Sequence, residues 1–159
     1  MHVDGAGFSS RRCSDKVDHG RYTSMAPPDS SSGAPALAPA LILLVEDEAA
    51  IREVSEAVLE AEGYRVVSTC NGADALDVLR AGLRPCMIIL DLMMPVMDGW
   101  EFRTAQLDDP ELLKIPTVVY TAVGNVRETV EKLNVAGGFE KGDFAEMLRF
   151  VAQFCRSRP

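Results

Sequence analysis

The chain has 159 residues, which suits one folded domain with some additional sequence. Its formal net charge is −8 at pH 7, and an acidic surface repels nucleic acid phosphates, so direct binding of DNA or RNA is not expected. No stretch approaches the roughly 18 apolar residues that a membrane span needs, so no membrane association is expected.

Residues 1–39 are rich in Ser, Gly, Pro and Ala. Such a composition cannot bury enough apolar surface to offset the entropy lost on ordering, so we expect a disordered tail. The folded domain is expected over residues 40–156, followed by a short C-terminal end, 157–159.

From residue 41 onward, apolar runs that are typical of buried strands alternate with segments of helical periodicity. Strands are expected at 41–45, 65–68, 86–90 and 117–120, with a short fifth strand around residue 139. Helices are expected after each strand. Three of them have a side chain that is typical of a helix N-cap, and the other two begin near residues 50 and 100. The three expected caps are Asn71, Asn125 and Asp143.

Five alternations of strand and helix predict an α/β fold with a doubly wound, five-stranded parallel sheet and helices on both faces. Right-handed crossovers leave few arrangements, and the order 2-1-3-4-5 is the natural choice. Its switch point lies between strands one and three. Glu46 and Asp47, which follow the first strand, are then expected to lie beside Asp91, which follows the third.

Three neighbouring carboxylates cannot all stay ionised unless a cation holds them. Mg²⁺ fits, because it binds oxygen ligands, uses few carboxylates and keeps open positions that admit a phosphoryl group. A carboxylate such as Asp91 can attack that group and form an aspartyl phosphate. Thr121, at the end of the fourth strand, offers a hydroxyl to the phosphoryl oxygens, and Lys141 offers an ammonium.

Histidine and cysteine chemistry is not indicated in the expected domain. The sequence has no histidine after His19, which leaves no histidine base or metal ligand there. The cysteines show no short paired spacing, so neither a zinc site nor a disulfide framework is expected, and a reducing cytoplasm fits. Cys86 lies in an apolar run and is expected to be a small buried hydrophobic residue. The four cysteines are Cys13, Cys70, Cys86 and Cys155.

In combination and in order, these motifs resemble those of a response-regulator receiver domain of two-component signalling, with its flavodoxin-like fold. The resemblance covers about residues 40–156. It rests on Glu46-Asp47, on Asp91 followed by Met94-Pro95 and Asp98-Gly99, on Thr121-Ala122 and on Lys141. It implies that Asp91 is the phosphoacceptor and that a histidine kinase or phosphotransfer protein is the donor.

The resemblance also implies the roles of the surrounding residues. Asp47 and Asp91 would bind Mg²⁺ directly, Glu46 through water, and the Met93 backbone carbonyl would complete the protein ligands. Thr121 and Lys141 would contact the phosphoryl group. The protein would not be an enzyme beyond its own phosphorylation and slow dephosphorylation. With no output sequence after residue 159, we expect a stand-alone cytoplasmic receiver that signals through contacts with an unknown downstream protein.

The sequence departs from the family pattern around Lys141. Gly142 follows Lys141, where the family usually has proline. Gly138 occupies the usual aromatic switch position, and Phe139 is the neighbouring aromatic residue. Two apolar residues, Met93 and Val123, stand where receivers place side chains beside the attacking water. Neither can orient that water, so slow self-dephosphorylation is predicted.

Two other functions fit parts of the pattern. A receiver-like binding module that is not phosphorylated would agree with the unusual residues around Lys141. An aspartate-nucleophile phosphatase of the haloacid-dehalogenase type would need a second acid two residues after Asp91, and Met93 occupies that place. A nucleotide-binding α/β protein is disfavoured, because Val45 leads into acids and not into a glycine-rich phosphate loop.

Overall fold

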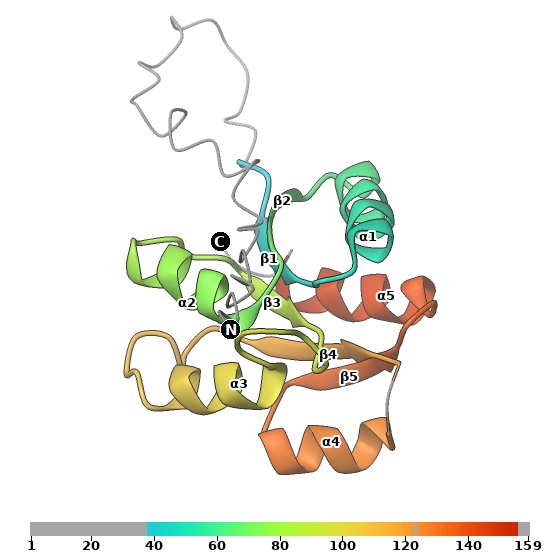
Figure 1. The fold of residues 1–159 in the computed structure, drawn as a ribbon. Coiled ribbons are helices and arrows are strands. Elements are labelled where there is room, and N and C mark those ends of the chain that lie inside the picture. Colours follow the sequence, from blue (N-terminus) through green and yellow to red (C-terminus); the bar gives the residue numbers. More distant parts are fainter. Residues whose placement is uncertain (1–37, 123, 156–159) are drawn as a thin grey trace, which may run out of the picture. The chain divides into compact units, whose positions relative to one another are not determined.

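A computed structural model describes residues 38–122 and 124–155 of the chain (Figure 1). Five strands form one parallel sheet in the order β2-β1-β3-β4-β5, which confirms the predicted doubly wound α/β fold. Residues 1–37 of the predicted tail and the end at 157–159 lie outside the described residues. The strands are β1 (Leu41–Val45), β2 (Arg65–Thr69), β3 (Met87–Leu90), β4 (Thr117–Thr121) and β5 (Gly137–Glu140).

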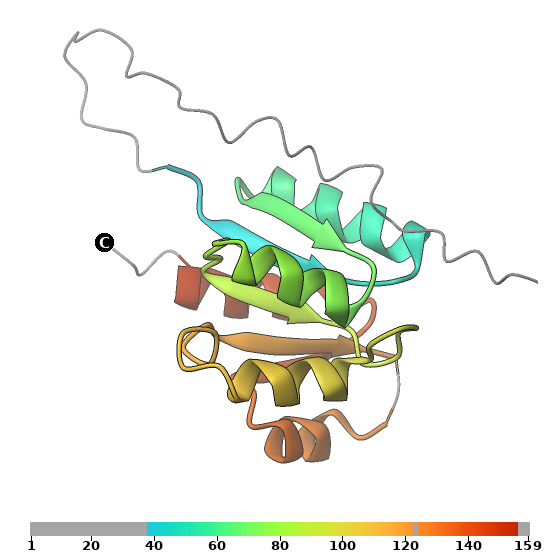
Figure 2. The ribbon, with the colours of Figure 1, turned by 60° about the vertical axis from the view of Figure 1, so that its left-hand side comes forward.

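Each strand is followed by a helix, and the helices cover both faces of the sheet. Helices α1 and α5 lie on one face, and α2 and α3 lie on the other (Figures 1 and 2). Among the described residues, no helix has the length and apolar character required to cross a membrane. The helices are α1 (Ala49–Ala61), α2 (Gly72–Arg80), α3 (Gly99–Leu107), α4 (Val126–Leu133) and α5 (Phe144–Cys155).

The central strands are buried on both faces because alternate side chains point to opposite layers of helices. Ile42 and Leu44 of β1 pack in a cluster with residues of α1 and α5. Leu43 and Val45 of the same strand pack in a cluster with residues of α2 and α3. This arrangement explains why the strands read as continuous apolar runs.

Polar side chains cap the helices where the sequence predicts them. Asn71 accepts a hydrogen bond from the backbone of α2, and Asn125 does so for α4. The Asp143 side chain accepts one from the N–H of Glu146, at 3.2 Å, at the start of α5. Helix α3 starts with a capping box in which Asp98 and Glu101 exchange side-chain and backbone hydrogen bonds of 2.8 and 3.1 Å.

The structure corrects one sequence-based expectation. Cys86 and Cys155 form a disulfide, although they are separated by 69 positions and no short spacing connects them. Cys86 precedes β3 and Cys155 ends α5, so the bond joins the end of that helix to the beginning of the central strand. The expectation of no disulfide, with Cys86 as an unbonded buried thiol, was wrong, because two distant segments of a packed core can bring cysteines together that no sequence pattern pairs.

Candidate functional site

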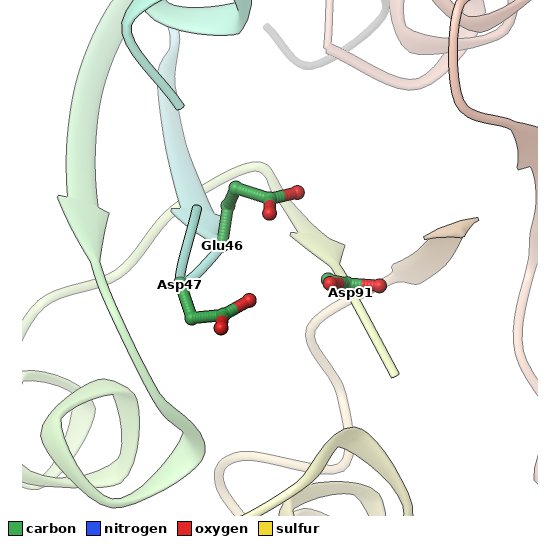
Figure 3. Close-up of side chains that lie close together, drawn as sticks. All are labelled: Glu46, Asp47 and Asp91. Carbon is green, nitrogen blue, oxygen red and sulfur yellow. The ribbon is translucent and has the colours of Figure 1, made fainter. Parts of the chain in front are cut away.

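Three carboxylates meet at the carboxyl edge of the sheet. Glu46 and Asp47 come from the loop after β1 and Asp91 from the end of the neighbouring strand β3 (Figure 3). One ligand oxygen of each lies within 4.8 Å of the others. Glu46 and Asp91 are buried, with 1% and 4% of their surface exposed, whereas Asp47 is exposed. The three acids that the sequence predicts at the topological switch point therefore lie together there.

The Asp91 carboxylate is held on both of its oxygens. Its Oδ1 accepts a hydrogen bond of 2.7 Å from the backbone N–H of Leu92. Its Oδ2 accepts one of 2.9 Å from the Nζ of Lys141. The buried charge is therefore partnered, as a carboxylate in a low-dielectric surrounding must be.

Lys141 bridges the two buried acids from the loop between β5 and α5. Besides Asp91, its Nζ lies 2.9 Å from Oε1 and 2.8 Å from Oε2 of Glu46. Its side chain is 14% exposed. Lys141 directly follows the parallel strand β5, so it lies at the same carboxyl edge of the sheet although it comes 95 residues after Glu46.

Burial and mutual contact shift the pKa values of Glu46 and Lys141. Burial raises the pKa of Glu46 and proximity to Asp91 adds to this effect, while the hydrogen bond from Lys141 opposes it. Burial by itself would lower the pKa of Lys141, but its hydrogen bonds to Glu46 and Asp91 outweigh burial and raise it. Lys141 therefore stays positively charged at neutral pH.

The loop that carries Glu46 and Asp47 is held by an arginine of α1. Nη1 of Arg52 donates to the backbone carbonyls of Glu46, at 2.8 Å, and of Asp47, at 3.1 Å. Sequence reasoning missed this residue. The one available signal was a basic side chain in the first turn of the helix that follows the acidic pair.

Thr121 and Met93 also lie at this edge. Thr121 is fully buried at the end of β4, beside β3, and its backbone carbonyl accepts a hydrogen bond of 3.1 Å from the N–H of Lys141. Met93 lies in the loop after Asp91 with its side chain 62% exposed. The loop thus turns its thioether to solvent.

The donor set fits a hard divalent cation. All three side chains offer oxygen, which Mg²⁺ and Mn²⁺ prefer, and a convergent arrangement within 4.8 Å suits a single ion. The three carboxylates and one ammonium leave an excess of about two negative charges when all are ionised. A bound divalent ion would balance that excess.

The family model for the response regulator receiver domain matches residues 42–140, which is more than half of the chain. The chain belongs to the response regulator receiver domain family. Members of this family are signalling modules of two-component systems that take phosphoryl groups from histidine kinases.

Sequence and structure comparisons agree with this membership. The probable transcriptional regulator ycf27 of Porphyra purpurea is 34% identical over 94 residues, which are 59% of this chain and 37% of that protein. The chain therefore spans less than half the length of this relative.

Two similar solved structures are those of a magnesium-bound receiver domain and of a phosphorylated response regulator. The receiver domain of the sensor histidine kinase PA1611 from Pseudomonas aeruginosa has a magnesium ion coordinated in its active-site cleft. Its TM-score is 0.67 and its identity 27%, over 76% of this chain and all of that one. The phosphorylated cyanobacterial phytochrome response regulator RcpA has a TM-score of 0.62 and an identity of 30%, covering 76% of this chain and 96% of that one.

Proposed function

We propose that the protein is the phosphoacceptor of a two-component phosphorelay, with Asp91 as the residue that receives the phosphoryl group. The observation that carries the proposal is the convergence of Glu46, Asp47 and Asp91 at one sheet edge, with Lys141 bridging the two buried acids. The donor is a phosphohistidine of a histidine kinase or phosphotransfer protein. The described residues contain no histidine, since the last one in the sequence is His19.

In the transfer, an oxygen of Asp91 attacks phosphorus as the bond between phosphorus and the donor imidazole nitrogen breaks. The electron pair of that bond leaves with the nitrogen. The hydrogen bond from the Leu92 N–H holds the Asp91 carboxylate in place, and the nearby ammonium of Lys141 offsets negative charge on the phosphoryl oxygens. Thr121 is proposed to donate its hydroxyl to one of those oxygens.

A divalent metal ion, Mg²⁺ in our proposal, would be held by Asp47 and Asp91, by Glu46 through water and by the Met93 backbone carbonyl. When bound, it neutralises charge on the phosphoryl oxygens and orients them. The exposed position of Asp47 leaves this side of the site open to solvent and to a partner.

The proposed output is a change in contacts with a downstream protein, without direct nucleic acid binding.

The packing between α4 and β5 differs from the usual receiver pattern at Gly138. A Cβ atom on Gly138 would lie 2.6 Å from Val130 and 2.7 Å from Val126, so α4 packs directly on the strand backbone. Phe139 instead packs on Phe150 of α5, with ring centroids 5.4 Å apart. An aromatic switch at position 138 is therefore not part of the proposed mechanism.

The proposal is tested by incubating the full chain with Mg²⁺ and acetyl phosphate and measuring protein mass. Wild type should gain one phosphoryl group that hydroxylamine removes, and Asp91→Ala should gain none. Asp98→Asn is a matched control, because it alters an acid of the α3 cap and keeps a good cap residue. Labelling that persists in Asp91→Ala would contradict the assignment.

The same experiment separates the alternatives. Continuous release of phosphate from free phosphoesters would identify a phosphatase. A chain that binds Mg²⁺ but never becomes labelled, with acetyl phosphate or with a phosphorylated kinase, would be a receiver-like binding module.

A further inference from the structure

The backbone around Lys141 is anchored to two consecutive residues of β4. The N–H of Lys141 donates to the carbonyl of Thr121 at 3.1 Å. The N–H of the next residue, Gly142, donates to the hydroxyl oxygen of Tyr120 at 2.7 Å. The second bond joins a side chain deep in the sheet to the loop that presents the lysine.

Tyr120 is buried and packed where it makes this bond. The residue is 1% exposed, and its ring packs against Phe144 with centroids 5.6 Å apart, inside the cluster between the sheet and helices α1 and α5. A buried hydroxyl without a partner would be costly, and the Gly142 N–H satisfies its oxygen. Burial raises the pKa of Tyr120, so the phenol keeps its proton at neutral pH.

Gly142 is the residue type that this arrangement needs. Its φ is +104°, which L side chains rarely adopt, although a Cβ there would meet nothing within 4 Å. Glycine is therefore required by the backbone conformation and not by space. Proline could not replace it, because its φ is fixed near −65° and it lacks the N–H that Tyr120 accepts.

We propose that Tyr120 is a positioning residue: its hydroxyl, through the Gly142 N–H, holds the loop in the conformation that places the Lys141 ammonium between Glu46 and Asp91. This inference rests on the proposed function, because it assigns Tyr120 a role in presenting Lys141 to the phosphoryl group. The tyrosine itself does not touch the reacting atoms.

The test begins with Tyr120→Phe, which removes the hydroxyl and keeps the ring. Phosphorylation of the full chain by acetyl phosphate should slow by about two- to tenfold, the effect of losing one hydrogen bond. Tyr64→Phe is the matched control. Tyr64 is also buried, and its hydroxyl has no hydrogen-bond partner among the described residues. The phosphorylation rate of Tyr64→Phe should therefore equal that of wild type. An unchanged rate for Tyr120→Phe would overturn the proposal.

A double variant distinguishes positioning from a general loss of packing. If Tyr120 acts through Lys141, adding Tyr120→Phe to Lys141→Met should cause no further slowing. If Tyr120→Phe slows the Lys141→Met protein by the same factor as it slows wild type, the hydroxyl does not act through the lysine and the proposal is wrong.

A second measurement does not need phosphorylation. The Lys141 side chain can be followed by NMR of lysine labelled at Cε, with the signal assigned from Lys141→Met. The signal should move toward that of a solvent-exposed lysine in Tyr120→Phe, because the ammonium loses its fixed contacts with Glu46 and Asp91, and should keep its wild-type position in Tyr64→Phe. A chain that is never phosphorylated would defeat the proposed function. The position of the lysine signal would still decide the positioning role, and an unchanged signal in Tyr120→Phe would overturn it.

Discussion

Gly99 lies directly against the backbone of Asp91. A Cβ atom on Gly99 would overlap the carbonyl oxygen of Asp91 and approach the Cα of Leu92 to 2.8 Å, and the Gly99 N–H donates to the Leu92 carbonyl at 3.0 Å. The start of α3 is thus packed against the loop that carries the proposed phosphoacceptor. The glycine of the Asp98-Gly99 pair is needed for this close approach.

Gly99→Ala should therefore lower the unfolding free energy by about 1–3 kcal/mol and slow phosphorylation of Asp91, because backbone must move away from the new methyl group. Urea unfolding and the acetyl phosphate assay measure the two effects. Gly82→Ala is the control. It introduces strain at φ +109° in the α2–β3 loop, at the opposite edge of the sheet, so it should lose stability without slower phosphorylation. Equal rates in all three proteins would contradict the prediction.

Metal binding should depend on pH through Glu46. Burial raises the pKa of Glu46. On acidification, Glu46 therefore becomes protonated at a higher pH than an ordinary glutamate does. Mg²⁺ favours the ionised carboxylate, and its affinity should therefore fall with decreasing pH. Titrations followed by the fluorescence of Trp100, which is near the site at the start of α3, measure this change. Glu46→Gln should bind more weakly at neutral pH and lose most of the dependence; if it keeps the wild-type pH profile, another group is responsible.

The disulfide between Cys86 and Cys155 should stabilise the oxidised protein. Because it closes a long loop in the unfolded chain, reduction should cost about 2–4 kcal/mol of unfolding free energy. Thermal unfolding with and without dithiothreitol measures the difference, and mass spectrometry of unreduced peptides identifies the linked pair. Cys70→Ser should behave like wild type, whereas Cys155→Ser should no longer respond to reductant. Equal stability of oxidised and reduced wild type would contradict the prediction.

Val96 adopts a backbone conformation that suits glycine. Its φ is +70° and its side chain is 80% exposed, so the strain of a β-branched residue is not offset by burial. Val96→Gly should raise the unfolding free energy by about 0.5–1 kcal/mol. Val96→Ala keeps a Cβ at the same φ and should gain less. Urea unfolding of the three proteins tests this order, and an alanine variant at least as stable as the glycine variant would refute the explanation.

The lifetime of the phosphorylated protein should be long. Met93 points its side chain into solvent beside Asp91, and a thioether cannot orient an attacking water; the sequence predicts the same for Val123, which lies outside the described residues. The double substitution Met93→Asn and Val123→Glu should shorten the lifetime, measured as decay of the label after removal of acetyl phosphate. Met93→Leu, which keeps an apolar side chain, should not. A lifetime unchanged by the polar pair would count against water positioning.

The sequence predicted the fold and the acidic cluster because both depend on regular patterns. Apolar runs and helical periodicity identify the strands and helices. The rule that carboxyl ends of parallel strands share one edge brings Glu46 and Asp47 to Asp91. The remaining features depend on contacts between distant residues. The sequence also predicts Lys141 at the site, but not its contact with Glu46, 95 residues away. That contact, the Cys86–Cys155 bond and the Tyr120–Gly142 hydrogen bond form only when the helices pack on the sheet.

One buried side chain ties α3 to the far end of α4. Arg103 is 5% exposed and donates to the carbonyls of Leu133, at 3.1 Å, and Asn134, at 2.5 Å, where α4 ends; none of its described partners is a carboxylate. Its charge therefore acts on the negative end of the helix dipole. Arg103 therefore anchors the C-terminal end of α4, and the Val126 end, which follows the Thr121 loop, is the end farther from this anchor.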